Sequence, residues 1–320
     1  KEVLNEMDYT SVINSLFIIF VLSIPGVVFR KLKMIDENQI KPVSSFMMKV
    51  ILPAVIIYSM QTNFSKDMLI AGGKVFGSIF ELFLCVFIFS AILSVVTKTG
   101  KKYIGIITFL LFFANTGGIG IPVMNMLFGT DAVFYASAAE MAVDIILFTA
   151  GVLLMQSSGK PVGGKYGINV KEIFSPGSFA IVIGLILFLT NTTLPSFING
   201  VLEKLMDASL AVTMFVIGCQ IGGVNISVLK KSGKIFALIL VAVSKLIIIP
   251  IIMYIIAFFV FKCGQMTSII LAVLFGMPTG GAAAIFAQEY SADVDFAAST
   301  ILLTDIFCLL TIPLLILFIK

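Results

Sequence analysis

Apolar residues gather into long runs along this chain, and polar residues, Gly and Pro gather between the runs. Because a helix needs about 20 predominantly apolar residues to cross a bilayer, we interpret the runs as ten transmembrane helices. The run at 177–191 is shorter than the others, and Pro195 soon after it indicates a turn. The ten predicted spans are 11–29, 45–61, 72–97, 103–128, 132–156, 177–191, 197–222, 233–261, 265–288 and 295–319.

The composition indicates an all-α polytopic membrane protein. Of the 320 residues, 59% are hydrophobic and 12% are charged, and the mean hydropathy is +1.14. A soluble domain carries about 25% charged residues. Histidine is absent and the four cysteines have no paired spacing, so we expect no metal site and no cofactor. The net charge of +4 comes from lysines in short loops, which does not indicate a nucleic-acid partner.

The basic residues orient the predicted spans. Thirteen of the 21 basic residues fall in alternate loops, which the positive-inside rule places in the cytoplasm. Both termini are then outside, in a multi-pass protein of the cell (plasma) membrane. Three acidic residues in the last inner loop (Glu289, Asp293 and Asp295) do not change this, since acidic residues contribute little to orientation. The thirteen are Arg30, Lys31, Lys33, Lys41, Lys98, Lys101, Lys102, Lys160, Lys165, Lys171, Lys230, Lys231 and Lys234.

One loop divides the chain into two halves. Residues 157–176 are rich in Gly, Ser and Lys and include Pro161 and Pro176, which is typical of a flexible linker. It separates a first five-helix repeat, residues 1–156, from a second, residues 177–320. Because each half has an odd number of spans, the second half is expected to be inverted relative to the first.

A glycine-containing break followed by two aspartates occurs once in each half. The spacings are 13 and 13 residues in the first copy (Gly118, Asp131, Asp144) and 12 and 12 in the second (Gly281, Asp293, Asp305). Breaks and carboxylates are both costly inside a membrane. Their repetition therefore predicts a transport site.

The breaks interrupt spans four and nine. Span 103–128 would be roughly 39 Å long as one helix, against a hydrocarbon core of about 30 Å, so it has length to spare. Pro122 has no amide hydrogen and its ring clashes with the carbonyl of Gly118 in a regular helix. The half-helix after each break presents free amide groups, which suit an anion. The predicted substrate-binding residues are Asn115, Thr116, Gly117, Gly118, Pro122, Pro278, Thr279, Gly280 and Gly281.

Polar side chains inside the spans are candidates for coupling transport to H+ or Na+. Asp144 and Asp305 lie in the middle of spans five and ten, and Glu140 lies one helical turn before Asp144. Lys245 in span eight and Gln220 near the end of span seven complete the set. In the structural alternative, Lys245 forms an ion pair with Asp144 or Asp305 that holds the helices together. Lys49 and Glu81 lie nearer span ends and carry less weight.

Several of these motifs resemble the auxin efflux carrier family. The run from Asn115 to Pro122 with Leu127-Phe128-Gly129 resembles its fourth-helix signature, and Gly276-Met277-Pro278 with Ala287 and Tyr290 resembles the ninth-helix counterpart. Leu52-Pro53-Ala54, Lys245 through Pro250, and Thr311 through Leu314 also fit. Bacterial malate and malonate carriers belong to this family, and bile acid:sodium symporters are similar in fold.

The resemblance implies a ten-helix carrier whose fourth and ninth helices are broken and cross. Spans 1, 2, 6 and 7 would form a scaffold, through which a homodimer could assemble, and spans 3–5 and 8–10 a transport domain that moves like an elevator. The family's substrates are organic anions, and its crossover asparagine and prolines correspond to Asn115, Pro122 and Pro278. No asparagine stands beside Pro278, which departs from a two-asparagine site.

We therefore expect a secondary carrier of a small organic anion such as malate, malonate or an auxin-like carboxylate, and not an enzyme. A transporter-like receptor that binds an anion without moving it is one alternative. The other is an intramembrane aspartyl protease that uses Asp144 and Asp305 as a carboxylate pair. Neither aspartate lies in the glycine-containing motif that such proteases carry.

Overall fold

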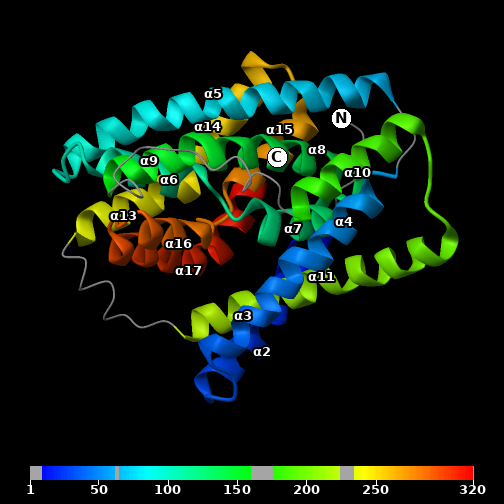
Figure 1. Ribbon diagram of the computed structural model, residues 1–320, viewed down its shortest axis with the longest axis horizontal. Helices are drawn as coiled ribbons and strands as arrows, with labels where there is room; N and C mark the ends of the chain where they lie inside the picture. Colours follow the sequence, from blue (N-terminus) through cyan, green and yellow to red (C-terminus); the bar gives the residue numbers. More distant parts are fainter. Residues whose placement is uncertain (1–8, 62–64, 160–175, 224–233, 320) are drawn as a thin grey trace.

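The computed structural model describes residues 9–61, 65–159, 176–223 and 234–319 (Figure 1). Within these ranges the chain is helical and contains no β-strand, apart from one isolated bridge between Ala114 and Thr279. Five of the helical segments are long and apolar enough to cross a membrane: Asn38–Ser59, Lys66–Val96, Thr130–Ser158, Ile235–Val260 and Val294–Leu315. The prediction of an all-α membrane protein is thus confirmed. The predicted linker at 157–176 lies almost entirely outside the described residues.

Each of the ten predicted spans contains helical residues in the described part of the chain, although only five helical segments are long and apolar enough to cross a membrane by themselves. The first half contains α2 (Tyr9–Lys31), α3 (Glu37–Phe46), η1 (Met47–Ile51), α4 (Leu52–Ser59), α5 (Lys66–Val96), α6 (Tyr103–Phe112), η2 (Thr116–Gly120), α7 (Ile121–Phe128), α8 (Thr130–Ile146), η3 (Leu147–Gly151) and α9 (Val152–Ser158). The second half contains α10 (Pro176–Thr190), α11 (Ser196–Gly222), α13 (Ile235–Val243), η6 (Ser244–Ile248), α14 (Ile249–Ile255), η7 (Ile256–Val260), α15 (Gln265–Phe275), α16 (Ala282–Glu289) and α17 (Val294–Ile319).

Three of the segments labelled η, which are single π-helical turns, lie immediately before a proline. Pro53, Pro122 and Pro250 each stand at the second position of the α-helix that follows η1, η2 or η6. A proline cannot donate to the carbonyl four residues earlier, and its ring pushes that carbonyl away. The helix therefore widens locally, which is the usual origin of a π-turn inside an α-helix and is frequent at functional sites. Two of these turns carry the intramembrane lysines, Lys49 in η1 and Lys245 in η6.

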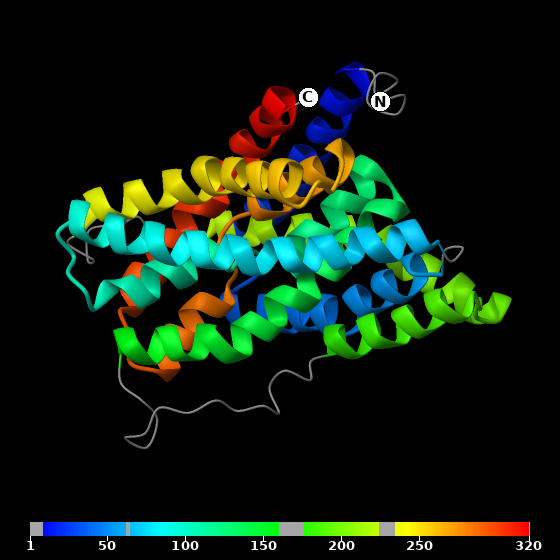
Figure 2. The same ribbon diagram turned by 90° about the horizontal axis from the view of Figure 1, so that it is seen from above.

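The helices pack in two groups (Figure 1). In what we call the α2/α11 group, α2, α3, η1 and α4 pack around α11, and α10 packs on α4 and η1. The other helices form what we call the crossing group, in which α5, α6, α8 and α9 pack with α13 to α17. The start of α2 and the end of α17 lie near each other in Figure 2, and the two helices are in contact. The division separates the helices of spans 1, 2, 6 and 7 from those of spans 3–5 and 8–10.

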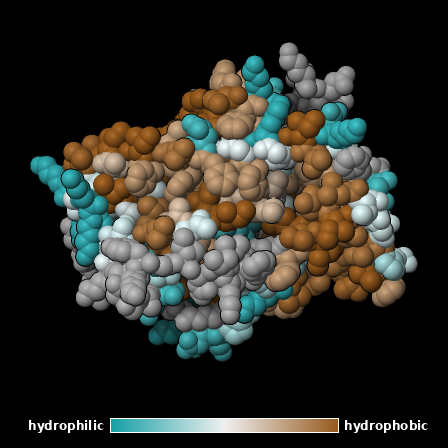
Figure 3. Space-filling model, turned by 45° about the horizontal axis from the view of Figure 1, so that its top comes forward, coloured by the Kyte–Doolittle hydropathy of each residue, from teal (hydrophilic) through white to brown (hydrophobic). Residues whose placement is uncertain are grey.

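The outer surface of the crossing group is apolar. Leu84, Ile88 and Ile92 form a stripe at four-residue spacing on α5, and each is more than half exposed. Leu310 and Leu314 do the same on α17. Figure 3 shows apolar side chains across much of the visible described surface. In water such an area would be unfavourable, so it is expected to face lipid.

Candidate functional site

The two broken helices meet at their breaks and cross there. The chain leaves α6 at Phe112 and α15 at Phe275, and the two connecting segments run antiparallel past each other. The Asn115 N–H donates to the carbonyl of Pro278 at 2.8 Å, and the Gly280 N–H donates to the carbonyl of Phe113 at 2.9 Å. This short pairing supplies partners for backbone groups that would otherwise be unsatisfied at membrane depth.

Side chains satisfy further carbonyls at the ends of the two half-helices. The Thr279 hydroxyl donates to the carbonyl of Leu110 at 2.9 Å. The ammonium group of Lys245 donates to the carbonyls of Leu111 at 2.9 Å and Phe275 at 3.2 Å. Lys245 is fully buried. The carboxyl ends of both half-helices are thereby held by one positive charge.

The ion pair considered for Lys245 is not seen among the described residues. Its ammonium group donates to carbonyl oxygens and not to Asp144 or Asp305. The ion pairs in the described part of the chain are Lys234 with Asp293 and Lys204 with Asp207. Lys245 therefore acts on helix ends and not on a carboxylate.

The first break is also tied to the α2/α11 group. The carbonyl of Gly118 loses its helical donor because Pro122 has no N–H. The hydroxyl of Thr213, on α11, donates to this carbonyl at 3.2 Å. Thr213 is buried, so it is a specific contact between the two groups of helices.

A cavity of about 510 Å³ lies beside the crossing, where the two groups of helices meet. Both breaks open onto it, and so do two carboxylates and one lysine. Its walls are otherwise largely apolar. The polar and backbone lining includes Asn115, Thr116, Gly117, Gly118, Gly280, Gly281, Ser44, Thr213, Glu140, Asp144 and Lys49, and the apolar lining includes Met47, Leu52, Ile56, Leu147, Phe148, Val216, Ile217 and Ile285.

Glu140 occupies the amino-terminal end of the half-helix that follows the first break. The Thr116 hydroxyl donates to its carboxylate. A Cβ placed on Gly117 would lie 2.7 Å from Glu140 Oε1, so only glycine allows the carboxylate to come this close to the backbone. Asp144 lies one turn further along the same face of α8. The protein therefore places its own anion where a free helix end attracts one.

The second break is open where the first is filled. A Cβ on Gly281 would meet nothing within 4 Å, and Gly281 is exposed to the cavity. Immediately after it begins α16, in whose first turn the Ala283 N–H donates to the carbonyl of Gly280 at 3.0 Å and the Ala284 N–H to that of Gly281 at 3.3 Å, while no side chain caps the helix. The two breaks are thus unequal: one holds an internal carboxylate and the other has room beside it.

Not every residue predicted for the site reaches the cavity. Pro122, Pro278 and Thr279 shape or brace the crossing but do not line the cavity. Asp305 and Lys245 are buried elsewhere in the crossing group, so Asp144 and Asp305 do not share the cavity as a protease pair would. The side chain of Gln220 lies outside the described residues.

Lys49 lines the cavity although sequence reasoning gave it little weight. The signal that would have identified it is Pro53, four residues later, because a proline there displaces the carbonyl of Lys49 and marks a local helix distortion. Glu81, judged similarly from sequence, is exposed on α5 away from this cavity.

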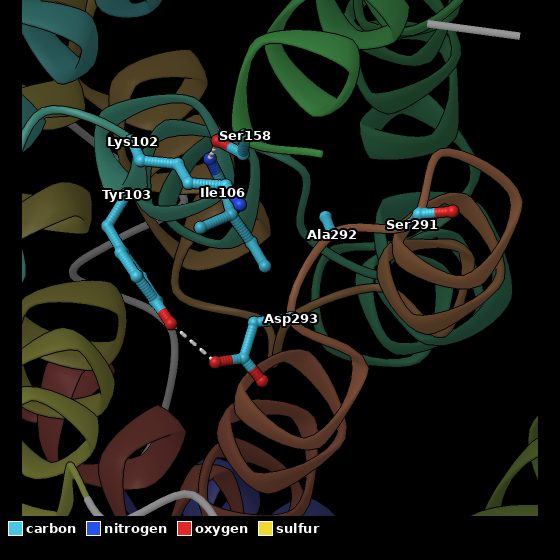
Figure 4. A pocket seen from close by; sticks show the side chains of 7 residues that line it. All are labelled: Lys102, Tyr103, Ile106, Ser158, Ser291, Ala292 and Asp293. Atoms are coloured by element: carbon cyan, nitrogen blue, oxygen red, sulfur yellow. Dashed lines mark hydrogen bonds between the residues drawn. The ribbon is translucent and has the colours of Figure 1, made fainter. Parts of the chain in front are cut away.

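A second polar cluster lies at one end of the crossing group, where Tyr103 and Asp293 point toward each other (Figure 4). Asp293, just before α17, accepts from the Tyr103 hydroxyl at 2.6 Å and the Phe296 N–H at 2.9 Å. The Lys234 ammonium lies 3.3 Å from the same carboxylate and 5.0 Å from the centre of the Tyr103 ring. Burial raises the pKa of Asp293, but these donors outweigh burial and the pKa is lowered below its ordinary value.

We expect Asp293→Asn to destabilise the protein by about 1 kcal/mol at neutral pH, because an amide replaces a partly exposed charge that three donors hold. A lowered pKa in the folded state stabilises the protein above the unfolded value of about 3.9, and this contribution is lost as the pH falls through the folded value. Melting curves in detergent should therefore differ between wild type and variant at pH 7 and converge below about pH 4.

The matched control is Asp207→Asn. Asp207 pairs with Lys204 at 3.4 Å, but both side chains are more than half exposed, so this variant should melt like the wild type. Equal melting temperatures for Asp293→Asn and the wild type at pH 7 would show that the cluster contributes nothing to stability.

Comparison with known proteins places this architecture in a family. The family model described as "Membrane transport protein" matches residues 11–164 and 166–316, which is nearly the whole chain. A curated relative, an "Uncharacterized transporter" of Methanothermobacter thermautotrophicus, is 28% identical over 205 residues. That match covers 62% of this chain and 63% of the relative, so the chain spans somewhat less than two thirds of the relative's length. On this evidence the chain belongs to the membrane transport protein family, which is the family of the auxin efflux carriers.

Proposed function

We propose that this protein is a secondary carrier of a small organic anion. The observation that carries the proposal is the cavity of about 510 Å³ onto which both helix breaks open, in a chain of a transport family. Binding pockets for small molecules are commonly of 300–1,000 Å³. Lys49 and the open helix end after Gly281 supply positive potential for a carboxylate, and Asn115 supplies a neutral hydrogen-bonding group.

The lining of the cavity favours one substrate class among the three expected from sequence. A dicarboxylate such as malate or malonate would place a second charge against apolar walls that include Leu52, Phe148 and Ile217. A monocarboxylate with an apolar body, like an auxin, would pack that body on these walls instead. We therefore rank the auxin-like carboxylate first.

An elevator movement of the crossing group against the α2/α11 group is supported by the position of the cavity, which lies between them. The antiparallel pairing of the two breaks is also what two inverted five-helix repeats would produce. In this proposal the membrane is the plasma membrane, ten helices cross it, and both termini are outside. A homodimer would form through the α2/α11 group.

Glu140 and Asp144 are the proposed coupling residues, because they share one face of α8 and both line the cavity. Two carboxylates one helical turn apart repel each other when both are ionised, which favours a state in which the pair holds one proton. Asp305 and Lys245 lie away from the cavity; we assign Lys245 to the support of the crossing and give Asp305 no role in coupling.

Uptake into proteoliposomes tests the proposal. Labelled indole-acetate, malonate and malate should be accumulated, in that order of preference, under an imposed proton gradient. Asn115→Ala should abolish uptake because it removes a polar group at the break, and Pro278→Ala because it releases the crossing. Asn125→Ala is the control, since Asn125 lies in α7 and does not line the cavity.

Two outcomes would contradict the proposal. Normal uptake by both Asn115→Ala and Pro278→Ala would exclude this cavity as the transport site. Tight binding of the anion without counterflow of labelled substrate would favour the alternative of a transporter-like receptor.

A further inference from the structure

The buried ammonium group of Lys245 lies where the carboxyl ends of two half-helices create a negative potential. Leu111 is next to the last residue of α6 and Phe275 is the last residue of α15, and Lys245 donates to both of their carbonyls. The carboxyl end of a helix carries about half a negative elementary charge. Two such ends face one ammonium group, so the local charge is close to balanced.

The other carbonyls at these two ends already have donors. Leu110 accepts from the Thr279 hydroxyl, Phe112 from the Ala114 N–H, and Leu274 from the Met277 N–H. Leu111 and Phe275 remain, and Lys245 is the group that satisfies them. Removing the ammonium group would leave two carbonyl oxygens and two helix dipoles directed at the same buried point.

In carriers coupled to cations, unwound carbonyls and the carboxyl ends of half-helices coordinate the ion. We propose that Lys245 is a built-in cation that fills such a position permanently, so that transport by this protein needs no Na+ at the crossing. This inference rests on the proposed transport function, and it leaves Glu140 and Asp144 as the groups that couple transport to protons.

Lys245 and the two carbonyls that it contacts would also move together in an elevator movement. Lys245 in η6, Leu111 in α6 and Phe275 in α15 all belong to the crossing group. Their contacts would therefore persist if that group moved as a unit. Lys245 does not line the cavity and is fully buried, so it is not positioned to meet a substrate. Asp305 lies in α17, which packs on η6, but it forms no ion pair with Lys245 among the described residues.

Wild-type protein gives the first test. Cations coupled to a ligand typically change its affinity by about 5–150-fold. We expect no change of this size in substrate affinity or uptake when Na+ is replaced by choline, and no shift of the melting temperature on adding NaCl instead of choline chloride. Strict dependence of either measurement on Na+ in the wild type would overturn the inference.

A matched pair of variants gives the second test. Lys245→Ala removes the charge and leaves space beside two carbonyl oxygens, whereas Lys245→Met removes the charge but fills the space. Na+, but not choline, should raise the melting temperature of the Ala variant and restore part of its uptake, and it should leave the Met variant unchanged. A stable, fully active Lys245→Ala protein in Na+-free buffer would contradict the inference, as would a variant that responds to no cation.

The melting measurements need no substrate. If the wild type transports none of the anions tested, the proposed function fails, yet the response of the Ala variant to Na+ still reports on the crossing. If Lys245→Ala does not fold, the wild-type measurements in Na+ and choline still decide the question.

Discussion

Gly218→Ala is expected to separate α2 from α11 and to destabilise the whole protein. A Cβ on Gly218 would lie 1.9 Å from the carbonyl oxygen of Ser23, and one on Gly26 would lie 2.1 Å from that of Phe215. These are backbone atoms, so no side-chain rotation relieves the clash. Overpacking costs about 1–3 kcal/mol where side chains can adjust, and we expect more here because two helices must move apart.

The effect should reach beyond these two helices. Small residues let transmembrane helices approach closely, and dispersion contacts between them replace the hydrophobic effect that lipid does not supply. The same α11 carries Thr213, whose hydroxyl donates to the carbonyl of Gly118 at the first break. Displacing α11 would therefore loosen the site as well as the packing.

Gly200→Ala is the matched control, because Gly200 lies in the same helix and a Cβ there meets nothing within 4 Å. Melting in detergent and the monodisperse yield from size-exclusion chromatography compare the variants. Gly218→Ala should lose yield and melt earlier, and Gly200→Ala should match the wild type or exceed it slightly through its better helix propensity. If the two variants behave alike, the close approach of α2 and α11 is not what holds this group together.

The sequence predicts the positions of the breaks well, because they depend on local chemistry. Pro122 and the glycines around it interrupt a helix wherever it is placed, and α6 ends at Phe112 while η2 begins at Thr116. The same holds for Pro278 between α15 and α16. The family motifs at these positions are carried by residues whose effect on the backbone needs no tertiary partner.

Which side chains lie beside each break depends on tertiary packing, which the spacing of residues in the sequence does not reveal. Glu140 is 23 residues beyond Gly117 in the sequence, and the close approach between them follows from how α8 packs on the break. The hydrogen-bond partners of Lys245 could not be predicted from the sequence for a similar reason. Charge pairing suggested an aspartate, but the structure uses backbone carbonyls, whose exposure exists only because two helices end at the same place.

The doubled glycine–aspartate pattern also proves unequal in its middle members. Asp293 lies in the cluster with Tyr103 and Lys234. Asp131 in the first copy lies in the first turn of α8, and its side chain is exposed. Similar spacing in the sequence reflects similar element lengths, whereas the contacts depend on which loops each half brings to that end of the molecule.

Glu140→Gln is expected to uncouple transport from the proton gradient. An amide preserves the size of the side chain and can still accept from the Thr116 hydroxyl, so the break should keep its shape. It cannot exchange a proton in the physiological range. Uptake driven by an inward proton gradient should fall to the level reached without a gradient, while exchange of labelled for unlabelled substrate continues.

The charges that face the cavity give the reason. Glu140 and Asp144 oppose the entry of an anion unless protons neutralise them, and Lys49 is the cation that lines the same space. With Glu140 replaced by an amide, one source of repulsion is gone permanently. The anion then binds without bringing the proton that Glu140 and Asp144 share in the wild type, so the gradient no longer drives its accumulation.

Asp305→Asn is the control that distinguishes a role in proton coupling from a general effect of replacing a buried carboxylate. Asp305 occupies the position in the second copy that Asp144 occupies in the first, but it does not line the cavity. The variant should therefore keep gradient-driven uptake. Parallel assays of gradient-driven accumulation and of counterflow distinguish the cases. Accumulation retained by Glu140→Gln, or lost equally by Asp305→Asn, would mean that another group carries the coupling proton, because Glu140 is the carboxylate that a substrate at the first break would meet.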